Sequence, residues 1–91
     1  MSTAPNVYSL STFLTEAKIE KLSNKGSVRP LFVRDTRLRG FGLKITPGDL
    51  KSFFVEARRP ISQGGTVIRI TLGRYPLKTL QKAREEALEA L

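Results

Sequence analysis

The stretch Phe41-Gly42-Leu43-Lys44-Ile45-Thr46-Pro47-Gly48-Asp49 decides the fold of this chain. Its first six residues place an apolar side chain at every second position, which indicates a β-strand with one face turned to a core. The Pro-Gly-Asp that follows is typical of a tight turn. Residues 52–58 have the composition of a further strand, which Pro60 closes because proline cannot donate to a β-ladder. The stretch and its continuation therefore predict an antiparallel pair of strands.

One further strand is predicted on each side of this pair. Residues 31–34 precede it and are rich in strand-forming side chains. Residues 66–72 follow it after the loop Ser62-Gln63-Gly64-Gly65, and they again alternate between two faces. Because the connections are short, the order indicates an antiparallel meander of three to four strands.

Helical patterns flank the sheet on both sides. A short helix is predicted over residues 14–22, with Thr15 as its N-cap. A stronger pattern follows Thr79, a second candidate N-cap, and runs to the last residue without a glycine that would end the helix. The predicted fold is α+β: a three- to four-stranded antiparallel sheet packed against a C-terminal helix, with a short N-terminal helix. We expect a flexible leader over residues 1–13 and a domain over residues 14–91, as a fragment of a longer protein. One face of the final helix is predicted to hold Leu80, Ala83, Ala87, Leu88 and Leu91.

The alternation sorts the strand residues into a core face and an open face. Phe54 falls on the polar side of this pattern, where it either packs under the leader or contacts a binding partner. The core face, beneath the C-terminal helix, is predicted to hold Phe41, Leu43, Ile45, Phe53, Val55, Ile68, Ile70 and Leu72, and the open face Lys44, Thr46, Glu56, Arg58, Arg69 and Thr71.

Charge gives the first indication of function. The chain has 16 Lys and Arg against 8 Asp and Glu, for a formal net charge of +8. Between Arg29 and Arg74 there are ten basic residues and three acidic ones, so that 10 − 3 = +7 of this charge falls in the sheet region. Such a field attracts polyanions, nucleic acid first and anionic membranes second.

The composition also excludes several kinds of chemistry. The chain has no cysteine, and therefore no disulfide and no thiolate zinc site, and it has no histidine, the commonest general base and metal ligand. No phosphate-cradling glycine loop or paired-carboxylate constellation is visible. We therefore expect no cofactor, no metal, no small-molecule substrate and no enzyme activity. Without an N-terminal apolar run for a signal peptide or membrane span, a cytoplasmic protein is expected.

The open face suggests how the chain would bind double-stranded DNA. Lysine and arginine release counterions when they meet phosphates, and a pair of strands fits the major groove, where arginine recognises guanine. An antiparallel sheet, however, normally has one solvated side with the same residue types, so alternation alone leaves both interpretations open. The predicted DNA-binding residues are Lys44, Thr46, Arg58, Arg69 and Thr71 on the sheet, with Arg37, Arg39, Lys51 and Arg59 in flanking loops holding the DNA backbone.

Several local motifs together resemble the arm-type DNA-binding domain at the N-terminus of phage and genomic-island tyrosine integrases. Each motif alone is weak, but their order and spacing are specific, and the resemblance covers residues 14–91. The motifs are Leu14-Thr15-Glu16-Ala17-Lys18-Ile19, the charged loop and Gly-Phe-Gly-Leu strand of Arg34 to Pro47, Lys51-Ser52-Phe53-Phe54, and Thr71-Leu72-Gly73-Arg74-Tyr75-Pro76 followed by Leu80, Ala83 and Arg84.

The resemblance implies a three-stranded sheet inserted in a major groove, and binding to arm sites that flank a recombination core site. It also implies that core-binding and catalytic domains follow in the full-length protein, a tyrosine recombinase of prophage or island integration and excision. The family's catalysis needs a tyrosine nucleophile with arginine and histidine, a setting that Tyr8 and Tyr75 lack. Two alternatives remain: a protein-interaction module that assembles integrase subunits, and an RNA or single-strand binding domain.

Overall fold

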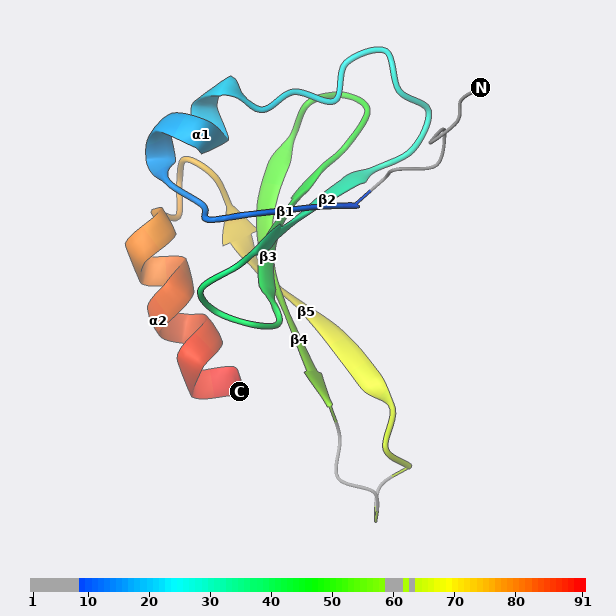
Figure 1. The fold of residues 1–91 in the computed structure, drawn as a ribbon, viewed down its shortest axis with the longest axis vertical. Helices are drawn as coiled ribbons and strands as arrows, with labels where there is room; N and C mark the ends of the chain where they lie inside the picture. The colour runs from blue at the N-terminus through cyan, green and yellow to red at the C-terminus, as the bar shows by residue number, and fades with distance from the viewer. Residues whose placement is uncertain (1–8, 59–61, 63) are drawn as a thin grey trace.

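The computed structural model describes residues 9–58, 62 and 64–91 of the chain (Figure 1). Within these residues the sheet has five strands in the order β1-β2-β3-β4-β5; β1 is parallel to β2, and the other neighbours are antiparallel. The α+β class with a C-terminal helix is confirmed, whereas the purely antiparallel sheet of three to four strands is not. The elements are β1 (Ser9–Thr12), α1 (Glu16–Lys21), β2 (Leu31–Asp35), β3 (Phe41–Ile45), β4 (Lys51–Arg58), β5 (Val67–Arg74) and α2 (Leu80–Ala90).

The additional strand is β1, in a segment where the sequence predicts a flexible leader over residues 1–13. Leu10 pairs with Val33 of β2, and the amide of Thr36 donates to the carbonyl of Thr12 at 3.1 Å. A parallel pair needs a crossover connection, which α1 and the following loop supply between β1 and β2. Residues 9–12 of the expected leader therefore form a strand, whose pairing depends on contacts distant in sequence. Residues 1–8 lie outside the described part of the chain.

Both predicted N-caps are confirmed. The hydroxyl of Thr15 accepts a hydrogen bond from the amide of Lys18 at 3.2 Å, at the start of α1. The hydroxyl of Thr79 accepts from the amide of Lys82 at 3.2 Å, at the start of α2. Each threonine satisfies one of the backbone donors that the first turn of a helix leaves without a partner.

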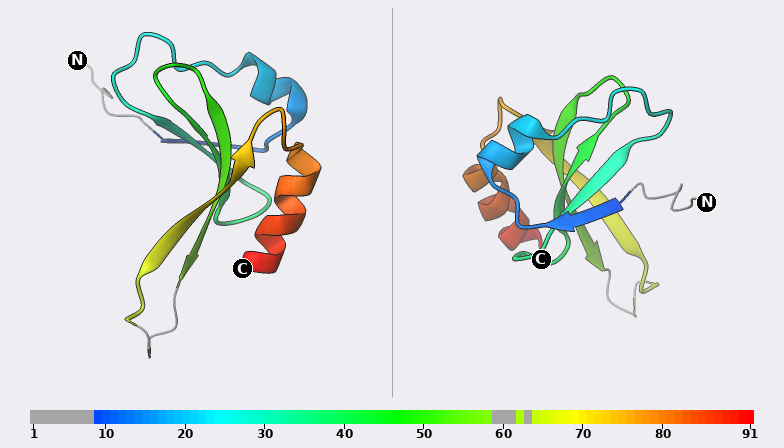
Figure 2. Two further views of the ribbon diagram at one scale, coloured as in Figure 1. Left: turned by 180° about the vertical axis from the view of Figure 1, so that it is seen from behind. Right: turned by 45° about the horizontal axis from the view of Figure 1, so that its top comes forward.

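The core lies between one face of the sheet and α2, with Ile19 contributed by α1 (Figure 2). The predicted burial of the alternating residues in β3, and of Phe53 and Val55 in β4, is confirmed. Burial of large aromatic and branched side chains supplies the main stabilisation of so small a domain. The core cluster comprises Leu14, Ile19, Val33, Phe41, Leu43, Ile45, Phe53, Val55, Leu80, Ala83 and Ala87.

The expected core face is only partly correct in β5 and α2. Phe53 pairs with Gly73 and Phe54 with Thr71, so Leu72 is an extra residue in β5 at a β-bulge. Leu72 packs against the core, but Ile68 is half-buried and Ile70 is 39% exposed. The β4–β5 hairpin extends beyond the end of α2 (Figure 1), which leaves this part of β5 uncovered. Leu88 and Leu91, which the helical spacing predicts on the buried face of α2, are 61% and 56% exposed.

A buried carboxylate joins the sheet to the segments around it. One oxygen of Asp35, Oδ1, accepts from the amide of Leu14 at 3.0 Å and from the Arg84 guanidinium at 3.3 Å. The other oxygen, Oδ2, accepts from the amide of Leu38 at 3.1 Å. Arg84 also donates to the carbonyl of Leu14 at 2.7 Å. This network fixes α2 and the entry into α1 against the end of β2.

Candidate nucleic-acid interface

The sheet face that points away from the core forms a continuous surface across β2, β3, β4 and β5. Strand pairing builds it in rows: Arg34, Gly42, Phe54 and Thr71 form one row, with successive members paired. Side chains of one row emerge on the same side of a sheet, opposite to the core positions. We call this surface the open face and define it by Phe32, Arg34, Gly42, Lys44, Ser52, Phe54, Glu56, Arg58, Arg69, Thr71 and Arg74.

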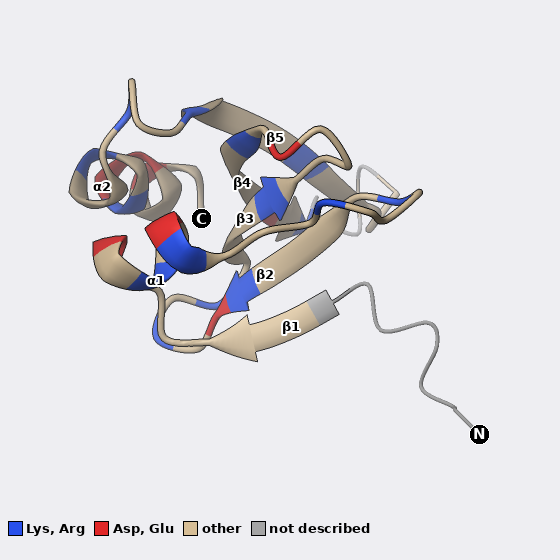
Figure 3. Ribbon diagram, turned by 90° about the horizontal axis from the view of Figure 1, so that it is seen from above, with Lys and Arg blue, Asp and Glu red and all other residues tan. Residues whose placement is uncertain are grey.

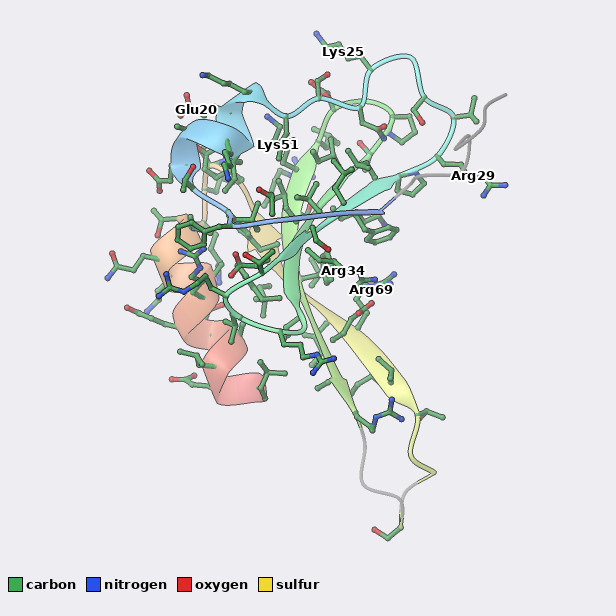
Figure 4. All side chains as sticks on the ribbon, viewed as in Figure 1. Glu20, Lys25, Arg29, Arg34, Lys51 and Arg69 are labelled. Atoms are coloured by element: carbon green, nitrogen blue, oxygen red, sulfur yellow. The ribbon has the colours of Figure 1, made fainter. Side chains whose placement is uncertain are left out.

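Glu56 is the one acidic residue of the open face, and two arginines, Arg34 and Arg69, share its carboxylate. Figure 4 labels both arginines. Arg34 donates from Nη1 to Oε1 of Glu56 at 2.5 Å. Arg69 donates to Oε2 of Glu56 from Nη2 at 2.6 Å and from Nε at 3.0 Å. The hydrogen bond from Arg34 is the main cause that holds the pKa of Glu56 below its ordinary value of 4.5. Burial opposes this shift, and Arg69 adds to it. The carboxylate is therefore ionised at neutral pH.

The neighbours of Phe54 explain how its ring can be buried although it lies on the open face. Its ring is 1% exposed, although it belongs to the polar side of β4. It meets Phe32 edge-on at 5.7 Å between ring centroids, and the guanidinium carbons of Arg34 and Arg69 lie 5.7 and 5.4 Å from its centroid. A Cβ at Gly42 would come within 2.7 Å of this ring, so the ring occupies the space that the glycine leaves. In this conformation Phe54 has no free surface for DNA.

A cleft of about 420 Å³ opens at one end of the open face. It lies where the loop after β2 approaches the β4–β5 hairpin, and three arginines contribute to its wall. The carboxylates of Asp35 and Glu56 also line this cleft, so its wall carries charges of both signs. The lining residues are Ser11, Arg34, Asp35, Arg39, Gly40, Glu56, Arg58 and Val67.

Comparison with known proteins identifies the class of the domain. A family model described as Arm DNA-binding domain matches residues 14–91, which is most of the chain. The chain belongs to the arm-type DNA-binding domains of tyrosine integrases. No curated protein matches it. The arm domain is thus a DNA-binding module without a catalytic role of its own.

The charged residues of the arm domain are distributed unevenly between its helices and its strands. Most of its acidic residues lie on α1 and α2, whereas most of the charged residues on the strands are lysine or arginine (Figure 3). In the part of the chain that the structure describes, no helix is long and apolar enough to cross a membrane. Nor do these residues include a group of three or more potential metal ligands.

Four of the predicted DNA-binding residues of the arm domain lie on the open face. The ammonium of Lys44 is 6.0 Å from the ring centroid of Phe32. Arg69 is held by Glu56 as described above, and Thr71 is exposed beside it on β5. Arg58 donates to the carbonyl of Gly65 at 3.0 Å, near the end of the hairpin. The structure therefore places Lys44, Arg58, Arg69 and Thr71 on the same face of the sheet, spread along its length.

Two predicted residues have structural partners instead. Thr46 follows β3, and its hydroxyl accepts from the amide of Leu50 at 3.1 Å within the turn. Lys51 is the first residue of β4 and not part of a loop. Its ammonium donates to the carbonyls of Ile19 and Glu20 at 2.6 and 3.4 Å, at the C-terminal end of α1 (Figure 4). A lysine at this end complements the negative end of the helix dipole.

The loop arginines are divided between the two sides of the sheet. Arg37 lies with its guanidinium carbon 5.2 Å from the ring centroid of Phe13, in a pocket that also includes Arg84 and Leu88 of α2. This position is on the helix side, away from the open face. Arg39 lines the arginine-rich cleft, and Arg59 lies outside the described residues.

Arg34 and Arg74 also lie on the open face, although they are not among the residues predicted from the sequence. Arg34 belongs to the open face through its pairing with Gly42, and Arg74 through its pairing with Ser52. Alternation over β2 separates Phe32 and Arg34 from their buried neighbours, so a signal for Arg34 is present in the sequence. For Arg74 the bulge in β5 reverses the alternation, and only the three-dimensional pairing identifies its face.

Proposed function

We propose that the arm domain binds double-stranded DNA by inserting its open face into a major groove. In the full-length tyrosine recombinase this binding would be sequence-specific and directed at arm sites, during prophage or island integration and excision. The observation that supports this most is the gathering of Lys44, Arg58, Arg69 and Arg74 with Thr71 on one face of β3, β4 and β5. Lysine and arginine would bind phosphates and guanine edges, and Thr71 a thymine methyl or a base-edge donor.

The arrangement of aromatic side chains favours duplex over single-stranded nucleic acid. Single-strand binding needs exposed rings on which bases stack. On the open face Phe54 is buried, and the Arg69 guanidinium carbon lies 4.4 Å from the ring centroid of Phe32. Both rings already have cationic partners, whereas the exposed residues around them are arginine and threonine. This surface suits phosphates and groove edges better than unpaired bases.

A second candidate function is docking on another integrase subunit through α2. It rests on Leu88, which is 61% exposed and lines two pockets on the helix side together with Arg84. Sedimentation of the domain without DNA tests this possibility. Self-association that Leu88→Ser abolishes would support it, and a monomer at all concentrations would exclude self-docking through α2.

The experiment for the DNA-binding proposal compares two charge changes on opposite sides of the sheet. Lys44→Ala removes a cation from the open face, and Lys82→Ala removes one from the exposed surface of α2. We expect Lys44→Ala to weaken binding of random duplex DNA and to lower the slope of log K against log salt by about 0.9 for each phosphate that the domain no longer neutralises. Lys82→Ala should leave the slope unchanged. Equal effects of the two variants would refute binding through the open face.

A further inference from the structure

We propose that Glu56 is a specificity-determining residue of the open face. In this role it is an internal counter-anion that withholds Arg34 and Arg69 from indiscriminate phosphate binding and, with Arg69, directs the face toward a G·C base pair. The inference rests on the proposed binding of duplex DNA by the open face. It assigns an affinity-lowering role to a residue within an otherwise cationic surface.

The position of Glu56 between the arginines is the first argument. Glu56 pairs directly with Arg69 across β4 and β5, while Arg34 reaches it from β2. The residues opposite the two partners on the segment between them are glycines: Gly42 pairs with Arg34, and the carbonyl of Gly40 accepts from the amide of Glu56. Three strands therefore converge on one carboxylate, and the three charges sum to +1. Without Glu56 the same site would carry +2.

The second argument is that Glu56 fixes the orientation of both guanidiniums. Each arginine makes two hydrogen bonds to Glu56, with Nη1 and Nη2 from Arg34 and Nε and Nη2 from Arg69. The Arg69 guanidinium carbon also lies 4.4 Å from the ring centroid of Phe32. A guanidinium has five N–H donors, so each arginine keeps three donors for DNA. Because the side chains are already ordered, binding through these donors costs less conformational entropy.

The third argument concerns which DNA groups tolerate the carboxylate. A phosphate that approaches either arginine also approaches the negative charge of Glu56, and the two repel each other. In the major groove a G·C pair presents acceptors on guanine and an amino donor on cytosine. Arginine can donate to the guanine while a carboxylate accepts from the cytosine amino group. The Arg69–Glu56 pair therefore matches the groups of one G·C pair and opposes the phosphates.

The first test measures binding of random duplex DNA by wild type and Glu56→Gln over a salt series. Removal of the charge should raise affinity about eightfold at 0.1 M salt for each additional phosphate that the arginines neutralise, and steepen the salt slope by about 0.9. The matched control is Glu89→Gln, which makes the same charge change on the exposed surface of α2 and should behave like wild type. Glu56→Asp keeps the charge and should retain the wild-type slope.

The second test selects sequences from a randomised duplex library with both proteins. Wild type should enrich a G·C pair at a fixed position, and Glu56→Gln should lose that preference while binding more tightly overall. In the free proteins, exchange of the Arg69 Nε–H proton should be slow in wild type and fast in Glu56→Gln. If Glu56→Gln does not fold, Glu56→Thr replaces it, because a β-branched residue suits a strand.

The outcomes separate this inference from the proposed function. If wild type fails to bind duplex DNA, the proposed function itself is wrong. If wild type binds, but folded Glu56→Gln binds random DNA no more tightly than Glu89→Gln or keeps the G·C preference, the role assigned to Glu56 is wrong and the proposed function stands. Tighter binding, a steeper slope and loss of the preference together support the inference.

Discussion

Asp35→Asn should destabilise the domain by about 3 kcal/mol, and the structure gives the reason for this magnitude. Asp35 is 5% exposed, and its donors are divided between its two oxygens: Leu14 and Arg84 on Oδ1, and Leu38 on Oδ2. Asparagine replaces one oxygen by an amino group, so in either orientation a buried N–H faces another donor. Each buried hydrogen bond that is lost in this way lowers the free energy of unfolding by about 1–3 kcal/mol. The lost ion pair adds little, because Arg84 is 26% exposed and solvent screens it.

Urea unfolding followed by circular dichroism measures this change, with thermal unfolding as a second observable. For a domain of this size, about 3 kcal/mol corresponds to a fall in Tm of roughly 12–24 °C. The control is Asp49→Asn, because Asp49 accepts from Ser23 and from the amide of Asn24 through one oxygen only. Asparagine retains such an oxygen and tolerates the positive φ of 69° at this position. If Asp35→Asn lowers the free energy of unfolding no more than Asp49→Asn does, the division of donors between the two oxygens of Asp35 does not stabilise the fold.

Three further changes test other parts of the structure. Gly42→Ala should lower the free energy of unfolding by roughly 1–3 kcal/mol, because its Cβ would lie 2.5 Å from the carbonyl of Val33 and 2.7 Å from the Phe54 ring; an unchanged urea midpoint would contradict this. Thr79→Ala removes the N-cap of α2 and should cost about 1 kcal/mol, whereas Thr79→Ser should cost much less. Since the folded-state pKa of Glu56 is lowered from 4.5, its ion pairs should stabilise the fold above that value and lose this effect as the pH falls through the lowered pKa. The stability difference between wild type and Glu56→Gln should therefore shrink from about pH 5 downward. A difference that grows on acidification would contradict a lowered pKa of Glu56 in the folded state.

The open face is only partly predictable from sequence. Alternation along a strand is a local property, so the sequence alone assigns Lys44, Arg58 and Arg69 to this face. Thr46 fits the same alternation, but the strand ends before it and its hydroxyl serves the turn. Lys51 has a partner 32 residues away, in α1. No pattern of neighbouring residues reveals such a contact.

The sequence by itself determined the positions of α1, α2 and β2 to β5, both N-caps, the basic sheet region and the family resemblance. These depend on periodicity, on single capping side chains and on composition, all of which act within a few residues. The tertiary structure alone decided the parallel β1, the bulge at Leu72 and the burial of Asp35 with Arg84. It also decided that Glu56 binds Arg34 and Arg69 at once. Each of these joins residues from segments distant in sequence, so it is set by how the strands pair and how α2 packs on them.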